Sequence, residues 1–290
     1  MKVFVNGFWK GFLEGTDPVS VSVFLELLTY VFNEKVECGT FEESDVLLES
    51  LFLSKTYILE KSWKYSFLFS GESRILPFYD KYTCVLYGVK NQQNIINCPL
   101  YVFYLHSSQK IHSIENLEPC IEVPRKSVCA IISNPHGAVR NKFLQALEKF
   151  MPIDYAGKYK TNVQIIDAPY NTEEFLNFIK QYKFVISMEN SILDTYITEK
   201  ITHGMLASTI PVYWGSPNAN QYFNKNRFLQ LKDDSDEEID RVIQKMLFLS
   251  KNDNFYLNIV NQPIFANQTN QMVRTIYDIG NEIKTMLHLH

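Results

Sequence analysis

Two short apolar runs separated by a helix-forming segment constrain the fold of this chain most. The runs are Phe184–Met188 and Thr209–Trp214, and both contain the β-branched residues typical of buried strands. Between them, Thr198 stands at a helix-capping position, and Ile201 and Met205 recur at helical spacing. The order strand, loop, helix, strand predicts a βαβ unit within a parallel sheet.

The start of the predicted helix carries an acidic and a basic residue, Glu199 and Lys200. In βαβ units, ligands bind beyond the carboxyl ends of the strands, where free N–H groups and the helix dipole favour phosphate. A lysine in the first turn opposes the dipole, so a nearby anion would remove a local conflict. Glu199 could accept hydrogen bonds from a ribose diol. A Glu-Lys pair alone is more often a solvated surface pair, so this interpretation depends on the surrounding motifs.

Three ordered motifs surround this pair: Glu189-Asn190-Ser191, Tyr196-Ile197-Thr198-Glu199-Lys200 and Ile210-Pro211-Val212-Tyr213-Trp214-Gly215-Ser216-Pro217. Together they resemble the signature of the α1,3/4-fucosyltransferase family. The similarity is strongest over residues 129–231 and weaker before them. The resemblance implies an α/β protein of GT-B architecture, with two Rossmann-like domains facing a cleft in which catalysis occurs. It also implies an enzyme that moves fucose from GDP-fucose to a glycan hydroxyl with inversion, in α1,3 or α1,4 linkage.

Two other functions remain open at this stage. One is a transferase for a different nucleotide-activated sugar, and the other is a catalytically silent glycan-binding module that keeps the fold. The phosphate-binding patterns G-x-x-x-x-G-K-[ST] and G-x-G-x-x-G are absent from the sequence, which disfavours kinase and dinucleotide-dependent classes.

A second candidate phosphate site lies in residues 133–142, which follow a predicted strand and open a helix. Arg140 in this segment could make two parallel hydrogen bonds to phosphate oxygens and offset charge as the sugar–phosphate bond breaks. The family has an arginine after an Asn-Pro loop at its donor site, and Arg140 matches that position.

The resemblance also suggests donor-binding roles for Glu189, Asn190 and Tyr196, beside Glu199 and Lys200. Glu189 and Asn190 could contact the transferred sugar or could order their own loop. Tyr196 could contact the sugar or the diphosphate, or could simply pack in the core.

Glu72 is the candidate catalytic base. It follows an aromatic predicted strand that ends at Ser70-Gly71. Inverting transfer needs one carboxylate to take the proton of the acceptor hydroxyl. The match is to a Gly-Glu element of the family, although Ser70 and Ser73 replace its more usual Thr and Asn. The alternative is an exposed glutamate in a turn.

A metal site is not predicted, and no cofactor beyond the GDP-fucose substrate is expected. Asp234-Ser235-Asp236 has the Asp-x-Asp form used by metal-dependent glycosyltransferases. These residues stand at a predicted helix start, with Ser235 and Glu238 at capping-box spacing, where carboxylates complement the dipole without a metal. We therefore prefer the helix-start interpretation.

The bulk properties fit a soluble two-domain protein. The 290 residues include 46% apolar types, and the formal net charge of −4 argues against a nucleic-acid partner. The apolar stretch Val19–Phe32 is interrupted by polar residues and reads as an amphipathic helix, so no transmembrane segment is expected. The five cysteines lack CxxC spacing, the N-terminus lacks a signal-peptide pattern, and a cytoplasmic location is expected.

The alternation of predicted strands and helices divides the chain into domains. Residues 1–122 form the expected acceptor-side domain that carries Glu72, and residues 123–268 form the donor domain. Residues 269–290 are predicted to form a helix that packs back on the first domain. In the second half we expect helices over 140–150 and 172–181, with a strand near 163–166 between them.

Overall fold

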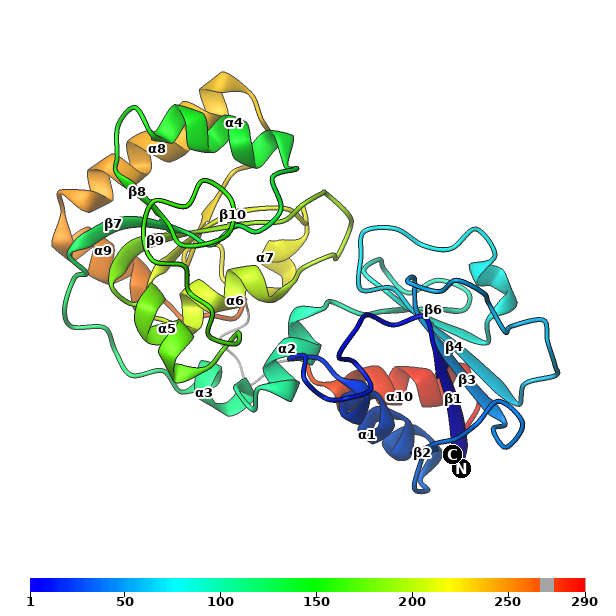
Figure 1. Cartoon of the computed structure of the whole chain (residues 1–290). Coiled ribbons are helices and arrows are strands. Elements are labelled where there is room, and N and C mark those ends of the chain that lie inside the picture. The colour runs from blue at the N-terminus through cyan, green and yellow to red at the C-terminus, as the bar shows by residue number, and fades with distance from the viewer. Residues whose placement is uncertain (267–273, 290) are drawn as a thin grey trace. The chain divides into compact units, whose positions relative to one another are not determined.

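The computed structural model describes residues 1–266 and 274–289 and divides the chain into two compact units. Unit 1 comprises Met1–Ser107, Leu193–Tyr196 and Arg274–His290. Unit 2 comprises Ser108–Ile192 and Ile197–Val273. Each unit is built on its own parallel sheet, as expected for two Rossmann-like domains (Figure 1).

Unit 1 holds a six-stranded parallel sheet in the order β2-β1-β3-β4-β5-β6. Its strands are short apolar segments that are mostly buried, as parallel strands covered on both faces must be. Their bounds are β1 Lys2–Asn6, β2 Glu37–Cys38, β3 Val46–Glu49, β4 Tyr65–Phe69, β5 Cys84–Tyr87 and β6 Ile95–Asn97. The helices of this unit are α1 Val21–Phe32, η1 Tyr79–Lys81, α2 Tyr101–Ser107 and α10 Ile276–Met286.

The C-terminal helix α10 lies beside α1 in unit 1 (Figure 1). The rings of Tyr30 and Tyr277 meet edge to face with their centroids 5.0 Å apart, and the Tyr30 hydroxyl donates to Asn281 Oδ1 at 2.7 Å. Gly280 permits this approach, because a Cβ there would lie 2.6 Å from the Tyr30 ring. The first and last helices of the described chain are therefore packed into one core.

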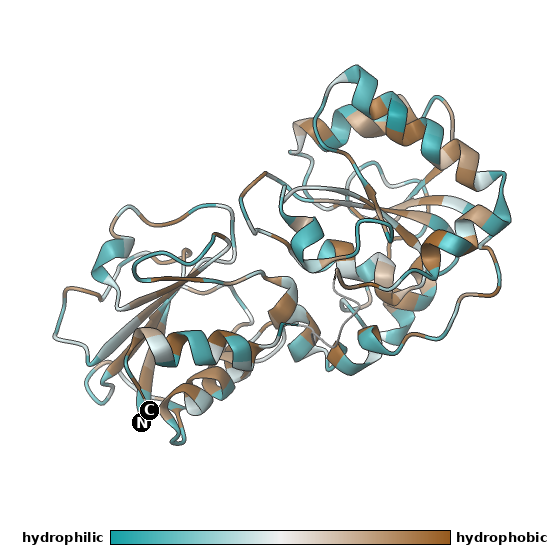
Figure 2. Ribbon diagram, turned by 180° about the vertical axis from the view of Figure 1, so that it is seen from behind, coloured by the Kyte–Doolittle hydropathy of each residue, from teal (hydrophilic) through white to brown (hydrophobic). Residues whose placement is uncertain are grey.

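Unit 2 holds a five-stranded parallel sheet in the order β11-β10-β9-β7-β8. Its strands are β7 Lys126–Ala130, β8 Ile153–Tyr155, β9 Tyr182–Met188, β10 Ile210–Trp214 and β11 Leu229–Gln230. Its helices are α3 Ile111–Glu115, α4 Ala138–Leu147, α5 Glu173–Ile179, α6 Glu199–Leu206, α7 Ala219–Tyr222, α8 Asp236–Ser250 and α9 Asp253–Val260. Figure 2 shows α8 with hydrophobic and hydrophilic sides, and its buried residues, Ile239, Val242, Ile243, Met246 and Leu249, follow helical spacing.

The βαβ unit predicted from the sequence is confirmed. Strands β9 and β10 pair in parallel, with Phe184 opposite Ile210 and Met188 opposite Trp214, and α6 connects them. The hydroxyl of Thr198 accepts from the Lys200 N–H, so Thr198 is the helix N-cap. Local apolar spacing and one capping residue were enough to place this unit.

The strand expected near residues 163–166 is wrong, and the strand beside β7 is β8, ten residues earlier. The Asn162 side chain accepts from Tyr155 N at 2.7 Å and donates to Ile153 O at 2.8 Å. These bonds bring the following segment back beside β8 without adding it to the sheet. Ile165 is 43% exposed there, so its apolar character did not mark a buried strand.

The structural units and the predicted domains divide the chain at different places. Residues 108–122, which were predicted to belong to the first domain, are grouped with unit 2. The predicted final helix begins at residue 276 within the described chain. The predicted boundary at 268–269 and residues 269–273 of that helix lie outside the described residues.

Residues 193–196, which follow β9 in the chain, belong to unit 1 although their neighbours on both sides belong to unit 2. Thr195 N donates to Gly88 O at 2.9 Å, and the Thr195 hydroxyl donates to Asn97 Oδ1 at 2.6 Å. Asp194 Oδ2 accepts from Lys90 N at 2.8 Å. The chain therefore passes into unit 1 and back within the motif region.

Among the described residues, no helix is long and apolar enough to span a bilayer.

Candidate active site

Arg140 is fixed at the start of α4, beyond the carboxyl end of β7. Arg140 is only 4% exposed. Its Nη2 donates to the carbonyls of Asn134 at 2.6 Å and His136 at 3.2 Å. Nη1 donates to Asn190 Oδ1 at 3.3 Å, whereas the buried Nε has no hydrogen-bond partner in the described chain. Burial lowers the pKa of Arg140 below its ordinary value. The loop thus holds a guanidinium that retains an unused donor.

Gly137 makes the position of Arg140 possible. A Cβ at residue 137 would lie 2.7 Å from Arg140 Nη2 and 2.9 Å from Cζ. These distances are shorter than any ordinary contact, and both atoms belong to a side chain already held by three hydrogen bonds. The Asn-Pro-His-Gly loop therefore has a steric reason for its glycine.

Glu189 follows β9 and organises the start of α6. It is fully buried, and its Oε1 accepts from Thr198 N at 2.8 Å, while the Thr198 hydroxyl lies 3.0 and 2.9 Å from its two oxygens. Gly215, after β10, leaves space for it, because a Cβ there would lie 2.5 Å from Glu189 Cγ. Of the two alternatives kept open for Glu189, loop ordering is the one that these contacts describe; a donor-binding role stays a prediction.

Lys200 projects from the first turn of α6 into this acidic environment. Its Nζ lies 3.2 Å from Glu189 Oε2, 3.4 Å from Glu199 Oε1 and 3.0 Å from the Thr198 hydroxyl. The side chain is 29% exposed, so it is the most accessible member of this cluster of ionised groups. An incoming anion would have to replace at least one of these contacts of the ammonium.

One small cavity brings Arg140, Glu199 and Lys200 together in unit 2. It lies at the carboxyl ends of β7 and β9 and beside the N-terminus of α6, where phosphate is favoured. Its volume is about 50 Å³, well below the ~300–1,000 Å³ of pockets that enclose whole ligands. The cavity can therefore accept only part of a nucleotide without rearrangement.

Three aromatic residues without a predicted role also line this cavity: Tyr170, Phe175 and His203. The His203 ring packs against Tyr170 and Phe175, with centroids 5.0 and 4.7 Å away, and its buried Nε2 has no partner among the described residues. His203 stands four residues after Glu199 on α6, which is a spacing that sequence could have flagged. Tyr170 lies in a loop and had no such signal.

Burial and neighbouring charges shift the ionisation of this cluster. Burial raises the pKa of Glu189, although Lys200 and Thr198 oppose the shift. Burial also acts against ionised Glu199, but Lys200, His203 and hydrogen bonds together lower its pKa. Burial lowers the pKa of His203 to about 4, against the opposing effect of Glu199. At neutral pH the imidazole is therefore uncharged.

The remaining predicted donor residues lie apart from each other. Asn190 is exposed and contacts Arg140, so it lies at the cluster. Tyr196 is buried within unit 1, where a Cβ on Gly88 would lie 3.0 Å from Tyr196 Cα. The structure therefore does not group Tyr196 with Arg140 and Lys200, and its donor-binding role stays a prediction.

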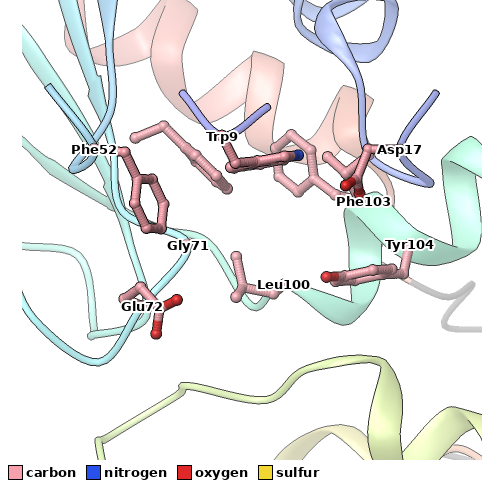
Figure 3. Close-up of a pocket in the computed structure, with 10 residues that line it drawn as sticks. Trp9, Asp17, Phe52, Gly71, Glu72, Leu100, Phe103 and Tyr104 are labelled. Carbon is pink, nitrogen blue, oxygen red and sulfur yellow. The ribbon is translucent and has the colours of Figure 1, made fainter. Parts of the chain in front are cut away.

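Glu72 lines a separate pocket of about 250 Å³ in unit 1 (Figure 3). It follows β4 and is half-buried, and the Ser70 hydroxyl donates to the carbonyls of Glu72 and Arg74 at 2.9 and 2.5 Å. Ser70 thus stabilises the turn that contains the Gly-Glu element. The pocket wall is mainly apolar and aromatic: Trp9, Val19, Phe52, Phe69, Gly71, Leu100, Phe103 and Tyr104, with Asp17 as a second acidic residue.

Asp234-Ser235-Asp236 forms the helix start that we preferred over a metal motif. The Ser235 hydroxyl accepts from Glu238 N, and Asp236 pairs with Lys142 at 2.8 Å. The reciprocal half of the capping box is not formed, because the Glu238 carboxylate accepts from Lys232 N and Arg241 instead. Metal independence stays a prediction.

Comparison with known proteins supports the family resemblance. Residues 121–261 match the family model described as glycosyltransferase family 10 (fucosyltransferase), C-terminal region. The chain is 27% identical over 211 residues to a putative fucosyltransferase of Acanthamoeba polyphaga mimivirus, covering 70% of this chain and 34% of the relative. It is 27% identical over 173 residues to an α-(1,3)-fucosyltransferase of Helicobacter pylori, covering 54% and 35%. The chain thus spans about a third of the length of these curated relatives.

The fold matches a solved α1,3-fucosyltransferase crystallised with GDP-fucose, with a TM-score of 0.73 over 99% of this chain and 90% of the other. The identity is 20%, so this likeness concerns the fold alone. Together with the two parallel sheets, it confirms the predicted GT-B class. The resemblance read from the three motifs is likewise confirmed.

Proposed function

We propose that this chain, whose residues 121–261 match the fucosyltransferase model of glycosyltransferase family 10, transfers fucose from GDP-fucose to a hydroxyl of a glycan acceptor. The observation that carries the proposal is the joint placement of Arg140 and Lys200 on one cavity at the N-terminus of α6. Two cations and a helix N-terminus favour a diphosphate at that point. Linkage in the α1,3 or α1,4 position is part of the proposal.

The proposed reaction inverts the configuration at C1 of fucose. Glu72 takes the proton of the acceptor hydroxyl as the hydroxyl oxygen bonds to C1, and the C1–O bond to phosphate breaks on the opposite face. The electron pair of that bond leaves with GDP. Arg140 and Lys200 stabilise the charge that accumulates on the diphosphate, so no metal ion is required in this proposal.

Glu199 and Asn190 would complete the donor site. Glu199 lines the same cavity, and its lowered pKa keeps it ionised as an acceptor for the ribose hydroxyls. Asn190 is exposed beside Arg140 and offers an amide to the diphosphate or the sugar. Glu189 would act indirectly, because it is fully buried and holds Thr198 and Lys200 in place.

Calorimetric titration with GDP, UDP, CDP and ADP, each with magnesium and with EDTA, tests the donor. Of the four nucleotides, wild type should bind only GDP, and its affinity should be the same with magnesium and with EDTA. Lys200→Ala should bind GDP at least ~10-fold more weakly. Binding of another nucleotide would favour a transferase for a different activated sugar. GDP affinity unchanged by Lys200→Ala would contradict the phosphate role of that residue.

Turnover of GDP-fucose with a glycan acceptor panel tests the base. Glu72→Gln should lose ~10²–10⁴-fold in kcat while GDP affinity is kept. Asp80→Asn, which neutralises an exposed acid outside the pocket, is the matched control and should keep full turnover. A near wild-type rate for Glu72→Gln would place the base elsewhere, and glycan binding without any turnover would favour the silent module.

A further inference from the structure

The pocket in unit 1 has the size and chemistry of a site for one small polyhydroxylated ring. Its volume of about 250 Å³ lies near the lower end of the ~300–1,000 Å³ typical of ligand pockets, which suits a ligand of about one sugar ring. Aromatic side chains dominate the wall, and two carboxylates are the charged groups among the ten residues that line it (Figure 3). Such pockets combine an apolar wall with a few polar groups that orient the ligand.

Trp9 and Asp17 form the polar end of this pocket opposite Glu72 (Figure 3). The indole nitrogen of Trp9 is buried and has no hydrogen-bond partner in the described chain. Burial raises the pKa of the nearby Asp17 carboxyl, and the Val19 backbone and the Trp9 indole act against that rise. A buried N–H without a partner is costly, so a ligand oxygen that accepts from it would remove that cost. The half-buried carboxylate beside it offers a matching acceptor for a hydroxyl.

The aromatic wall supplies the apolar face for such a ring. Trp9 meets Phe52 edge to face with ring centroids 6.3 Å apart, and it also packs against Phe69 at 6.4 Å. Phe52 is 48% exposed, so part of its ring is available at the rim of the pocket. A Cβ at Gly71 would lie 3.2 Å from the Phe69 ring and 3.9 Å from Trp9, so the glycine leaves the space beside these two rings unfilled.

We propose that this pocket binds a single neutral sugar ring, the unit of the acceptor that receives the transfer, and that Asp17 makes it discriminate against acidic sugars. Trp9 donates its indole N–H to a ring or hydroxyl oxygen, and Asp17 accepts from a neighbouring hydroxyl. The identification of the bound sugar as the acceptor rests on the proposed function, but the binding of the sugar itself requires no donor. A uronic acid would bring a third carboxylate beside Asp17 and Glu72, with no cationic side chain in the pocket lining to offset it.

Titration with two matched glycosides tests the inference without GDP-fucose. Methyl β-glucoside and methyl β-glucuronide share one ring and differ by the carboxylate, and binding is followed by calorimetry and saturation-transfer NMR at neutral pH and low salt. Wild type should bind the neutral ring at millimolar concentrations and the uronide about 10-fold more weakly. Asp17→Asn should reduce this ratio to about 3 or less, mainly by improving uronide binding.

Two further variants separate the pocket from general effects. Asp80→Asn removes the same charge from an exposed site outside the pocket and should leave the ratio unchanged. Trp9→Phe keeps an aromatic ring but removes the N–H, and it should weaken both glycosides about equally. Equal wild-type affinity for the two glycosides, no binding of the neutral ring, or a ratio that Asp17→Asn leaves intact would each overturn the inference. Binding of the neutral sugar without any fucose transfer would contradict only the proposed function. Fucose transfer without weaker binding of the uronide would contradict only this inference.

Discussion

The carboxylate of Glu189 accepts hydrogen bonds from both the backbone N–H and the hydroxyl of Thr198, the residue that caps the helix carrying Lys200. A residue at the end of one strand thus fixes the first turn of the next helix. Because Lys200 also pairs with Glu189, the position of the ammonium depends on a side chain that is itself fully buried. This relationship explains why Glu189 belongs to the motif without requiring that it touch a ligand.

Glu189→Gln should destabilise the protein and weaken GDP binding together. The amide replaces one accepting oxygen with a donor that faces the Thr198 hydroxyl, and it removes the ion pair with Lys200. The expected loss in free energy of unfolding is about 2–3 kcal/mol, measured by urea denaturation. Glu42→Gln, at an exposed position, should change stability by less than ~0.5 kcal/mol. Unchanged stability in Glu189→Gln would show that the buried contacts are not net stabilising.

His203 should make stability depend on pH below neutrality. Its folded pKa is about 4, against an unfolded value near 6.5, so the unfolded state binds the proton first as the pH falls. Stability from this residue is therefore complete above about pH 7 and is lost progressively toward pH 4. Between pH 8 and pH 5 the loss amounts to about 2 kcal/mol.

Urea denaturation of His203→Gln at several pH values checks this prediction. The variant should show a shallower loss of stability between pH 8 and pH 5 than wild type, because glutamine does not titrate. His112→Gln, at an exposed histidine, should follow the wild-type curve. Parallel curves for wild type and His203→Gln would contradict a buried neutral imidazole.

Gly137→Ala should displace Arg140 and reduce nucleotide affinity. The added methyl would lie 2.7 Å from Arg140 Nη2, so the guanidinium must leave the carbonyls of Asn134 and His136. We expect about 10-fold weaker GDP binding by calorimetry, similar to Arg140→Lys, which keeps the charge but loses the planar donor fork. GDP affinity that survives in Gly137→Ala but falls in Arg140→Lys would show that the guanidinium tolerates another position.

Glu49→Gln should destabilise unit 1. The fully buried Glu49 carboxylate accepts from Asn6 Nδ2, Tyr57 N and the hydroxyls of Thr56 and Tyr82, at 2.5–2.9 Å. An amide would turn one acceptor into a donor facing these donors, at a cost of about 3 kcal/mol in free energy of unfolding. Glu60→Gln, which affects only an exposed pair with Lys55, is the control and should cost under ~1 kcal/mol.

Local patterns in the sequence predicted what local physics determines. The strand runs Phe184–Met188 and Thr209–Trp214, the Thr198 cap and the Ser235 cap all depend on residues within a few positions of each other, and the structure confirms them. The strand predicted near 163–166 is wrong because Ile166 packs against α5 and does not pair in the sheet.

The rest of the candidate sites depends on contacts between distant segments. Trp9, Asp17 and Tyr104 line one pocket with Glu72 only because the fold of unit 1 gathers four separate stretches of chain. Tyr196 belongs to unit 1, where its neighbour Thr195 hydrogen-bonds to Gly88 and Asn97, about a hundred residues earlier. No periodicity or spacing in a single sequence reports such pairings.

The packing of α10 against α1 sets the order in which the polypeptide can mature on the ribosome. Residues of α1 such as Leu27 and Leu28 emerge early, but Ile279 and Ile283, which share their core, are made after the whole of unit 2. Unit 2 can therefore complete its fold first, although domains made earlier usually fold earlier. Until the last helix is synthesised, the part of α1 that packs on α10 stays uncovered, so translational pausing before residue 276 would lengthen its exposure to chaperones and to aggregation.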